Sequence, residues 1–427
     1  MRLIVGIATF FDAFDAVSIA YVLPVIIPLW KIAPTHVGLL ISVGYVGQIL
    51  GAFFFGWFAE RSGRLKSLTL SVAILGIMSF LCAVSWNYVS LLVFRFIQGF
   101  GLGGEVPVAA AYINELSKAK GRGKFVLLYE LIFVVGLVMA ALLGYWVVPH
   151  LGWHYMFLIG GAPALVIPLF LRFLPESPRW LANHGRIDEA EKLVTDLERI
   201  MSRNGQVELP PVQEATVTLA EKPTSWRELF QGIYLRRTLT VWVIWFGAYF
   251  VTYGLTTWLP ALYSSVFKLP LQQSLLYSLI TSVAGFIGAF ICALLIDTVG
   301  RKAWFTMAFL GGALFMFALW QTGARTPQIV VTYASLSYLF ISSISLALYL
   351  YSPEIYPTRM RALGSSIGSA WLRVASAIGP YVVGVVVSSY SLSLAFAIFG
   401  LVALIAAVIT GMFAVETKGK VLEEISP

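Results

Sequence analysis

Long apolar stretches follow one another along almost the whole chain, and they constrain its fold more than any other feature. An α-helix needs about 20 mostly apolar residues to cross the hydrocarbon core of a membrane. One polar interval separates two sets of six such stretches. They cover residues 3–30, 36–59, 67–86, 89–114, 123–148 and 153–173, and then 237–263, 271–296, 303–322, 327–352, 361–389 and 392–415. This pattern predicts an all-α polytopic membrane protein with twelve transmembrane helices.

The composition agrees with this prediction and argues against several other classes. Only 12% of the residues are charged and 59% are hydrophobic, whereas soluble globular proteins carry about 25% charged residues. The apolar fraction is also too high for a disordered chain. The cysteines, Cys82 and Cys292, and the four histidines show no disulfide or metal-ligand spacing. An enzyme has no support either, because no phosphate loop and no nucleophile–base pattern stands out.

The basic residues predict the orientation of the chain. Lysines and arginines cluster in the loops after the second, fourth, eighth and tenth stretches, whereas the opposite loops hold only Lys31, Lys268 and Arg325. Because cytoplasmic loops carry the excess of lysine and arginine, both termini and the central interval are predicted to be cytoplasmic. The net charge of +8 therefore belongs mostly to membrane loops, and we expect no nucleic-acid partner.

The predicted domains are an N-terminal six-helix bundle, a cytoplasmic linker, a C-terminal six-helix bundle and a cytoplasmic tail. Their ranges are 1–174, 175–235, 236–415 and 416–427. In the linker, 187–201 carries apolar residues at helical spacing, which predicts an amphipathic helix against the cytoplasmic face. Ser225 and Glu228 have the spacing of a capping box at the start of a short helix. We interpret the linker as a tether between the bundles.

Acidic and basic residues recur at equivalent helix ends in the two halves, which indicates an internal repeat. Glu60-Arg61-Ser62-Gly63-Arg64 follows the second stretch, and Asp297-Thr298-Val299-Gly300-Arg301 follows the eighth. Such residues can form charge pairs and helix-end contacts that hold the bundles together on one side and break when the protein rocks. The candidate gating residues are Glu60, Arg61, Gly63, Arg64, Glu115, Arg122, Asp297, Arg301, Glu354, Arg361, Glu176 and Arg179.

Ionisable residues inside the membrane are costly and mark functional sites. Asp12 and Asp15 are one helical turn apart on one face. Asp15 and Arg95 lie at matching depth, so they can pair as a proton switch or as a static link between two helices. Glu105 lies near the middle of the membrane and can either titrate or brace a helix pair. The candidate proton-coupling residues are Asp15, Arg95, Asp12 and Glu105.

Arg373 is the intramembrane charge of the second half. Unless it is structural, it can reach an acid across a cavity or bind an anion, because a guanidinium holds a carboxylate through two parallel hydrogen bonds. Tyr249 and Tyr253 are four residues apart on one helix face and could hold an aromatic ring. The candidate substrate-binding residues are Arg373, Tyr253, Tyr249, Glu130, Trp371, Tyr349 and Trp258.

Three motifs at the cytoplasmic helix ends make the chain resemble the major facilitator superfamily over essentially its full length. They are Pro175-Glu176-Ser177-Pro178-Arg179, Pro353-Glu354-Ile355-Tyr356-Pro357 and Glu416-Thr417-Lys418-Gly419, and they narrow the resemblance to the sugar-porter and organic-ion-transporter branch. Glu60 stands where this family usually has aspartate. The resemblance implies two pseudo-symmetric six-helix bundles and proton symport, with Asp15 and Arg95 at the positions of the proton-coupling pair.

The same resemblance argues for an anionic substrate and against a sugar. Arg373 occupies the position of the anion-binding arginine of the organic-anion transporters, and Tyr253 matches a cavity tyrosine of that family. Positions that hold sugar-binding glutamines in sugar porters are Glu130, Leu137, Val243 and Ile244 here. Three of these four are apolar.

Four further segments resemble the bacterial niacin carriers, which are relatives of the organic-ion transporters. They include Gly103–Ala109, Leu127–Glu130, Trp245–Pro260 and Tyr351–Glu354. The resemblance implies a monomeric importer of nicotinate in the bacterial inner membrane, working by alternating access with the proton as coupling ion and no cofactor. A benzoate-like acid, a hydrophobic cation exported with Glu105 and Glu130 as counter-charges, and a receptor without transport are the alternatives.

Overall fold

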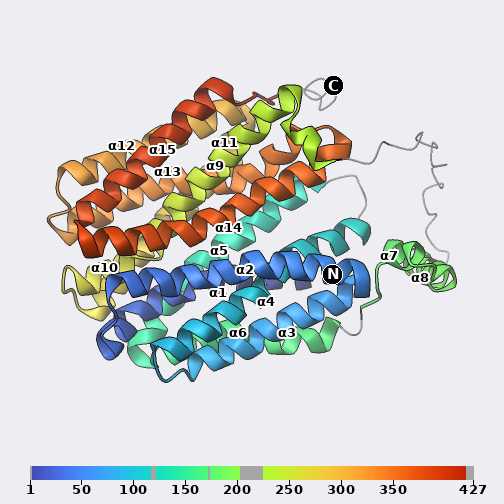
Figure 1. The fold of residues 1–427 in the computed structure, drawn as a ribbon, viewed down its shortest axis with the longest axis horizontal. Helices are drawn as coiled ribbons and strands as arrows, with labels where there is room; N and C mark the ends of the chain where they lie inside the picture. The colour runs from blue at the N-terminus through green and yellow to red at the C-terminus, as the bar shows by residue number, and fades with distance from the viewer. Residues whose placement is uncertain (1, 117–121, 172–173, 202–224, 420–427) are drawn as a thin grey trace.

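The computed structural model describes residues 2–116, 122–171, 174–201 and 225–419 and consists almost entirely of helices (Figure 1). In this part of the chain eleven helices are long and apolar enough to cross a membrane, and His154–Leu169 forms a further apolar helix. The N-terminal half holds α1 (Arg2–Trp30), α2 (Pro34–Ser62), α3 (Arg64–Ala83), α4 (Tyr88–Leu116), α5 (Arg122–His150) and α6 (His154–Leu171). The C-terminal half holds α9 (Gly232–Thr256), α10 (Leu259–Ser265), α11 (Leu271–Val299), α12 (Arg301–Gln321), α13 (Pro327–Glu354), α14 (Thr358–Ser389) and α15 (Leu392–Phe413). The predicted all-α fold is therefore confirmed.

The seventh predicted stretch is broken rather than continuous. α9 ends at Thr256, and the short helix α10 begins at Leu259 with Pro260 in its first turn. Proline has no N–H to donate to the preceding turn, so it fits the start of a helix better than its interior. The Trp258 indole at the break donates a hydrogen bond of 2.9 Å to the Pro380 carbonyl of α14. The predicted span 237–263 lies within Gly232–Ser265, which forms one candidate membrane span, and the structure adds this interruption of the helix.

The second and fourth long helices of each half are in direct backbone contact. A Cβ atom on Gly51 of α2 would collide with the Phe100 carbonyl of α4, and one on Gly288 of α11 would collide with the Leu339 carbonyl of α13. Small residues allow such close packing of membrane helices. The pairs occupy equivalent places in the two halves, so the repeat seen in the motifs extends to the packing.

The two halves meet at the end of the molecule opposite the chain termini and the linker helices (Figure 1). A Cβ atom on Gly38 of α2 would lie 2.8 Å from the Pro380 carbonyl oxygen of α14. Tyr21 of α1 and Ser282 of α11 form a hydrogen bond of 3.4 Å between the halves. In the predicted orientation this end faces away from the cytoplasm, and we call it the closed end.

The linker is anchored to the N-terminal half. α7 (Pro178–Asn183) carries Trp180, whose indole donates a hydrogen bond of 2.8 Å to the Glu60 carbonyl at the end of α2. α8 (Ile187–Met201) is the predicted amphipathic helix, and its Ala190 packs against Trp180, whereas Ile187 is 56% exposed. The predicted capping box precedes η1 (Trp226–Phe230). Residues 202–224 lie outside the described part of the chain.

Candidate functional site

Charged side chains from both halves gather around α1. Asp12 and Asp15 are buried on this helix. Arg373 of α14, from the other half, and Asp15 lie close enough to Asp12 to interact electrostatically with its carboxylate. No salt bridge joins Asp12 to a described residue. The structure therefore places Arg373 opposite an acid without pairing the two.

Asp15 and Arg95 are connected through a third residue instead of by direct contact. Arg95 Nη1 donates a hydrogen bond of 2.7 Å to Gln98 Oε1, and Gln98 Nε2 donates one of 2.7 Å to Asp15 Oδ2. The same amide donates to the Ser79 hydroxyl at 2.6 Å and accepts a weak bond from the Cys82 thiol at 3.7 Å. The side chain of Gln98, a residue 1% exposed, thus uses both amide protons and both oxygen lone pairs.

Asp15 Oδ1 faces away from this network. It is buried and accepts no hydrogen bond from a described residue. A Cβ atom on Gly160 of α6 would lie 2.9 Å from it. The sequence placed Asp15 and Arg95 at one depth, which the structure supports, but the direct ion pair is replaced by the Gln98 amide.

Glu105 lies ten residues after Arg95 on α4 and is 5% exposed. Asp12 and Asp15 lie close enough to Glu105 to interact electrostatically with its carboxylate, and both are acids. Among the described residues the group thus contains three carboxylates, from Asp12, Asp15 and Glu105, and two guanidinium groups, from Arg95 and Arg373. The predicted substrate residue Glu130 has its side chain outside the described part.

Arg373 is half-buried and has no hydrogen-bond or ion-pair partner among the described residues. Its Nε is among the buried atoms left without a partner. A guanidinium removed from water is costly unless its donors are satisfied. Arg373 is therefore suited to bind an anion that enters between the halves.

Aromatic rings line α9 on the side of this group. Trp245 and Tyr249 stack with ring centroids 5.5 Å apart, and Tyr249 stacks on Tyr253 at 5.9 Å. Tyr349 of α13 meets the edge of Trp245 at 4.9 Å, and Tyr45 of α2 lies 5.1 Å from Tyr253. The predicted residues Tyr249, Tyr253 and Tyr349 are thus brought together, and Tyr45 joins them from the other half.

Two predicted substrate residues lie elsewhere. Trp258 is buried at the closed end, where its indole proton is used by the Pro380 carbonyl. Trp371 packs against Trp242 and Phe246 at 5.3 and 6.1 Å. It is two residues from Arg373, and at 3.6 residues per turn the two side chains leave α14 in nearly opposite directions. The sequence analysis assigned Trp258 and Trp371 to the substrate site because they are aromatic, but here both tryptophans pack helices against one another.

The predicted gating residues of the first half anchor the start of α3. Arg64 pairs with Glu60 at 2.8 Å, and the Glu176 carboxylate accepts hydrogen bonds from the backbone N–H of Arg64 at 3.0 Å and of Leu65 at 3.2 Å. Gly63 precedes this helix with φ +109°. A carboxylate at a helix N-terminus satisfies free N–H groups and favours the helix dipole.

The second half repeats this arrangement at the start of α12. Arg301 pairs with Asp297 at 2.7 Å and with Glu354 at 3.1 Å. The Glu416 carboxylate accepts from the backbone N–H of Arg301 at 2.9 Å and of Lys302 at 3.1 Å. Every described pair lies within one half. The prediction that these charges hold the two halves together is not met in this structure, because the halves meet at the opposite end.

The remaining predicted gating residues have no ion pair within the described part of the chain. Arg61 lies 5.7 Å from the centre of the Trp57 ring, and Arg179 is exposed. Arg361 is half-buried with an unpartnered Nε. The side chains of Glu115 and Arg122 lie outside the described residues.

The Glu416 carboxylate at the start of α12 is expected to contribute to the free energy of unfolding in a way that depends on pH. Burial alone would raise the pKa of Glu416, but four backbone N–H donors hold it below its usual value of 4.5. The contribution is therefore complete above about pH 4.5 and is lost as the pH falls through the lower folded value. We expect Glu416→Gln to lower stability by about 1 kcal/mol.

Thermal unfolding of the purified protein at pH 6 and below pH 4 would measure this contribution. The difference between wild type and Glu416→Gln should shrink as the pH falls. Glu189→Gln is the matched control, because Glu189 only forms an exposed pair with Arg186 at 2.5 Å and such pairs contribute little. An equal effect of both substitutions, or a difference independent of pH, would contradict the prediction.

Two six-helix halves that meet at one end around buried, partly unpaired charges define a membrane transporter of the two-bundle type. The chain belongs to the family described as sugar (and other) transporter, whose sequence model matches residues 19–427.

Two curated relatives within this family are named for niacin transport. The niacin transporter NiaP of Acinetobacter baylyi is 37% identical over 430 residues, covering 99% of this chain and 95% of the relative. The putative niacin/nicotinamide transporter NiaP of Bacillus subtilis is 28% identical, covering 98% and 96%. A partially occluded, inward-open structure of the xylose transporter XylE from E. coli has a TM-score of 0.72 at 20% identity, covering 99% of this chain and 98% of that one. The predicted resemblance and the twelve-helix fold are confirmed.

Sequence reasoning missed Gln98, Ser79 and Tyr45. Gln98 carried a signal, because a polar residue three positions after an intramembrane arginine lies one turn away on the same helix face. Ser79 and Tyr45 are on other helices, and small hydroxyls and tyrosines are too common in membrane helices to stand out.

Proposed function

We propose that the protein is a proton-coupled importer of a small aromatic carboxylate, with nicotinate as the substrate, working by alternating access. Arg373 carries this proposal, because its guanidinium is half-buried between the halves and makes no hydrogen bond with a described residue. The stacked tyrosines of α9 supply ring faces against which an aromatic substrate could pack. The similarity to transporters named for niacin supports nicotinate over a sugar.

Proton coupling is proposed from the charged side chains around α1, which are those of Asp12, Asp15, Glu105, Arg95 and Arg373. The acids outnumber the cations among the described residues of this group, with three carboxylates and two guanidinium groups. An acid in this position is suited to bind a proton on one side of the membrane and release it on the other. Asp15 is our choice, because its Oδ1 is buried and unpartnered.

Uptake of labelled nicotinate into proteoliposomes tests the proposal. With an inward proton gradient we expect accumulation above the outside concentration, and with a collapsed gradient only equilibration. No uptake under either condition would overturn nicotinate transport. Equilibration without accumulation would overturn proton coupling alone. Uptake of benzoate in preference to nicotinate, or export of hydrophobic cations, would identify the alternative substrates.

Gln98 provides a sharper test of the coupling pathway. Gln98→Leu keeps a similar volume but leaves Asp15 Oδ2 and Arg95 Nη1 buried without their hydrogen bonds, each costing about 1–3 kcal/mol. We expect gradient-driven accumulation to fall roughly tenfold or more and the pH profile of uptake to shift. Gln98→Glu should shift the profile as well, since an ionised carboxylate cannot donate to Asp15.

Gln273→Leu is the matched control for Gln98, because Gln273 only donates to the Tyr277 hydroxyl at 3.2 Å, outside the charged group. It should leave the pH profile unchanged. If Gln98→Leu lowered uptake at all pH values by one factor, Gln98 would be a packing residue and its role as a link between Asp15 and Arg95 would be wrong.

A further inference from the structure

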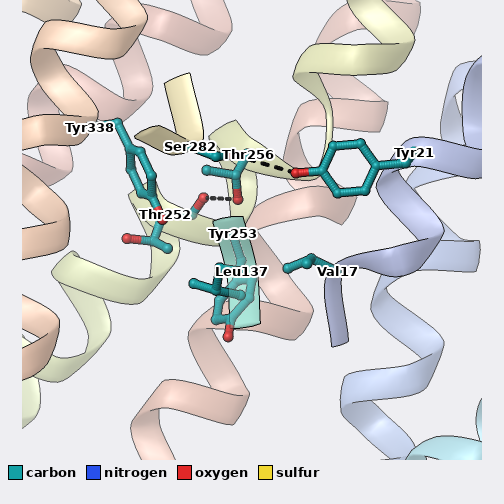
Figure 2. Close-up of a pocket in the computed structure, with 8 residues that line it drawn as sticks. All are labelled: Val17, Tyr21, Leu137, Thr252, Tyr253, Thr256, Ser282 and Tyr338. Atoms are coloured by element: carbon teal, nitrogen blue, oxygen red, sulfur yellow. Dashed lines mark hydrogen bonds between the residues drawn. The ribbon is translucent and has the colours of Figure 1, made fainter. Parts of the chain in front are cut away.

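A small pocket lies between the halves (Figure 2). It has room for about one water-sized group. The N-terminal half contributes Val17, Tyr21 and Leu137, and the C-terminal half contributes Thr252, Tyr253, Thr256, Ser282 and Tyr338. Six of these eight residues carry a hydroxyl group, although most of the exposed wall is apolar.

Some of these hydroxyl groups form hydrogen bonds within the protein, and others do not. Thr256 donates to the Thr252 carbonyl at 2.7 Å, and Ser282 binds the Tyr21 hydroxyl at 3.4 Å. By contrast, the hydroxyl of Thr252, a residue 4% exposed, is buried and has no hydrogen-bond partner among the described residues. The Tyr338 hydroxyl also makes no hydrogen bond with a described residue. A buried hydroxyl without a partner is costly, so Thr252 is available to a ligand, and the Tyr338 hydroxyl lines the same pocket.

The pocket lies within the length of a small aromatic acid from Arg373. On α14, Gly368 packs against Trp245 of α9 and Gly379 packs against Gly254. Arg373 lies between Gly368 and Gly379 on α14, and interpolation between these two contacts places it level with Tyr249 of α9. Thr252 and Thr256 follow three and seven residues later on α9, which corresponds to roughly 5–10 Å at 1.5 Å per residue.

We propose that the hydroxyls of Thr252 and Tyr338 form a subsite for a hydrogen-bond-accepting ring atom, such as the nitrogen of a pyridinecarboxylate whose carboxylate is bound by Arg373. This inference rests on the proposed function and deepens it, because it explains how nicotinate is distinguished from benzoate. The two acids have the same shape and charge. A pocket with buried hydrogen-bond donors rejects the analogue that lacks the acceptor, since its donors are then left unsatisfied.

Competition binding with nicotinate, benzoate and picolinate tests the subsite in the purified full-length protein. Picolinate carries its ring nitrogen beside the carboxylate, too close to Arg373 to reach the pocket. Wild type should bind nicotinate more tightly than the other two acids. Thr252→Val and Tyr338→Phe should each weaken nicotinate roughly five- to tenfold and leave benzoate and picolinate within twofold.

Tyr333→Phe is the control on the same helix, because Tyr333 is outside the pocket and packs against Phe315. It should change no affinity. An equal loss for nicotinate and benzoate in the pocket variants would overturn the subsite while leaving nicotinate transport intact. If wild type binds none of the three acids, the proposed function fails and the subsite fails with it.

Discussion

Replacing Arg373 with alanine is expected to lower the affinity for nicotinate by roughly 10- to 100-fold. A hydrogen bond from a charged group to a carboxylate contributes about 1.5–3 kcal/mol, and every 1.4 kcal/mol is about tenfold in affinity. Arg373 makes no hydrogen bond with a described residue, so its removal leaves no protein acceptor unsatisfied there. The loss should therefore report the contact with the ligand. Equilibrium binding of labelled nicotinate in detergent measures it.

Two further variants make this test specific. Arg373→Lys keeps the charge but not the planar pair of donors, so it should retain only part of the affinity. Arg325→Ala removes an exposed arginine of the same half and should have no effect. Unchanged nicotinate binding by Arg373→Ala would refute the anion site, whatever the uptake assay shows.

Gly38→Trp is expected to abolish transport, with a loss of at least 100-fold, while a folded binding site remains. Even a Cβ atom at Gly38 would lie 2.8 Å from the Pro380 carbonyl oxygen and 3.1 Å from Tyr381 Cα, where the halves meet. An indole there holds the halves apart at the closed end. The protein can then still open at this end but cannot close it, so the transport cycle stops.

Uptake in proteoliposomes and nicotinate binding in detergent, measured together, separate this effect from misfolding. Gly56→Trp on the same helix is the matched control, because a side chain at Gly56 meets no atom within 4 Å. Gly384→Leu should reproduce the block from the opposite side, since Gly384 faces the Pro34 carbonyl. Wild-type uptake by Gly38→Trp would mean that closure of the halves at this end is not required for transport.

Much of the fold could be predicted because its signals are local. Helix length, apolar runs and the repeated motif around Gly63 and Gly300 depend on short pieces of chain. The helix at 187–201 and the Ser225 capping box were predicted for the same reason. The break after Thr256 was harder to predict from the sequence, because Pro260 lies inside a long apolar stretch that reads as one continuous span.

The site was predicted only in part. The intramembrane charges were identified by their cost in lipid, and this physical argument singled out Arg373 and Asp15 without any knowledge of their neighbours. The amide between Asp15 and Arg95, and the hydroxyl pocket beside Tyr253, join residues from several helices. Their spacing in the sequence carries no information about such contacts.

The sequence by itself thus determined the membrane environment, the twelve spans and the identity of the buried charges, because each follows from the free energy of placing a given residue in hydrocarbon. Tertiary structure alone decided which charges meet, that the ion pairs at the starts of α3 and α12 lie within each half, and that the halves close at the end around Gly38. These features depend on how closely backbones approach one another, and that distance is set by the packing of helices far apart in the chain.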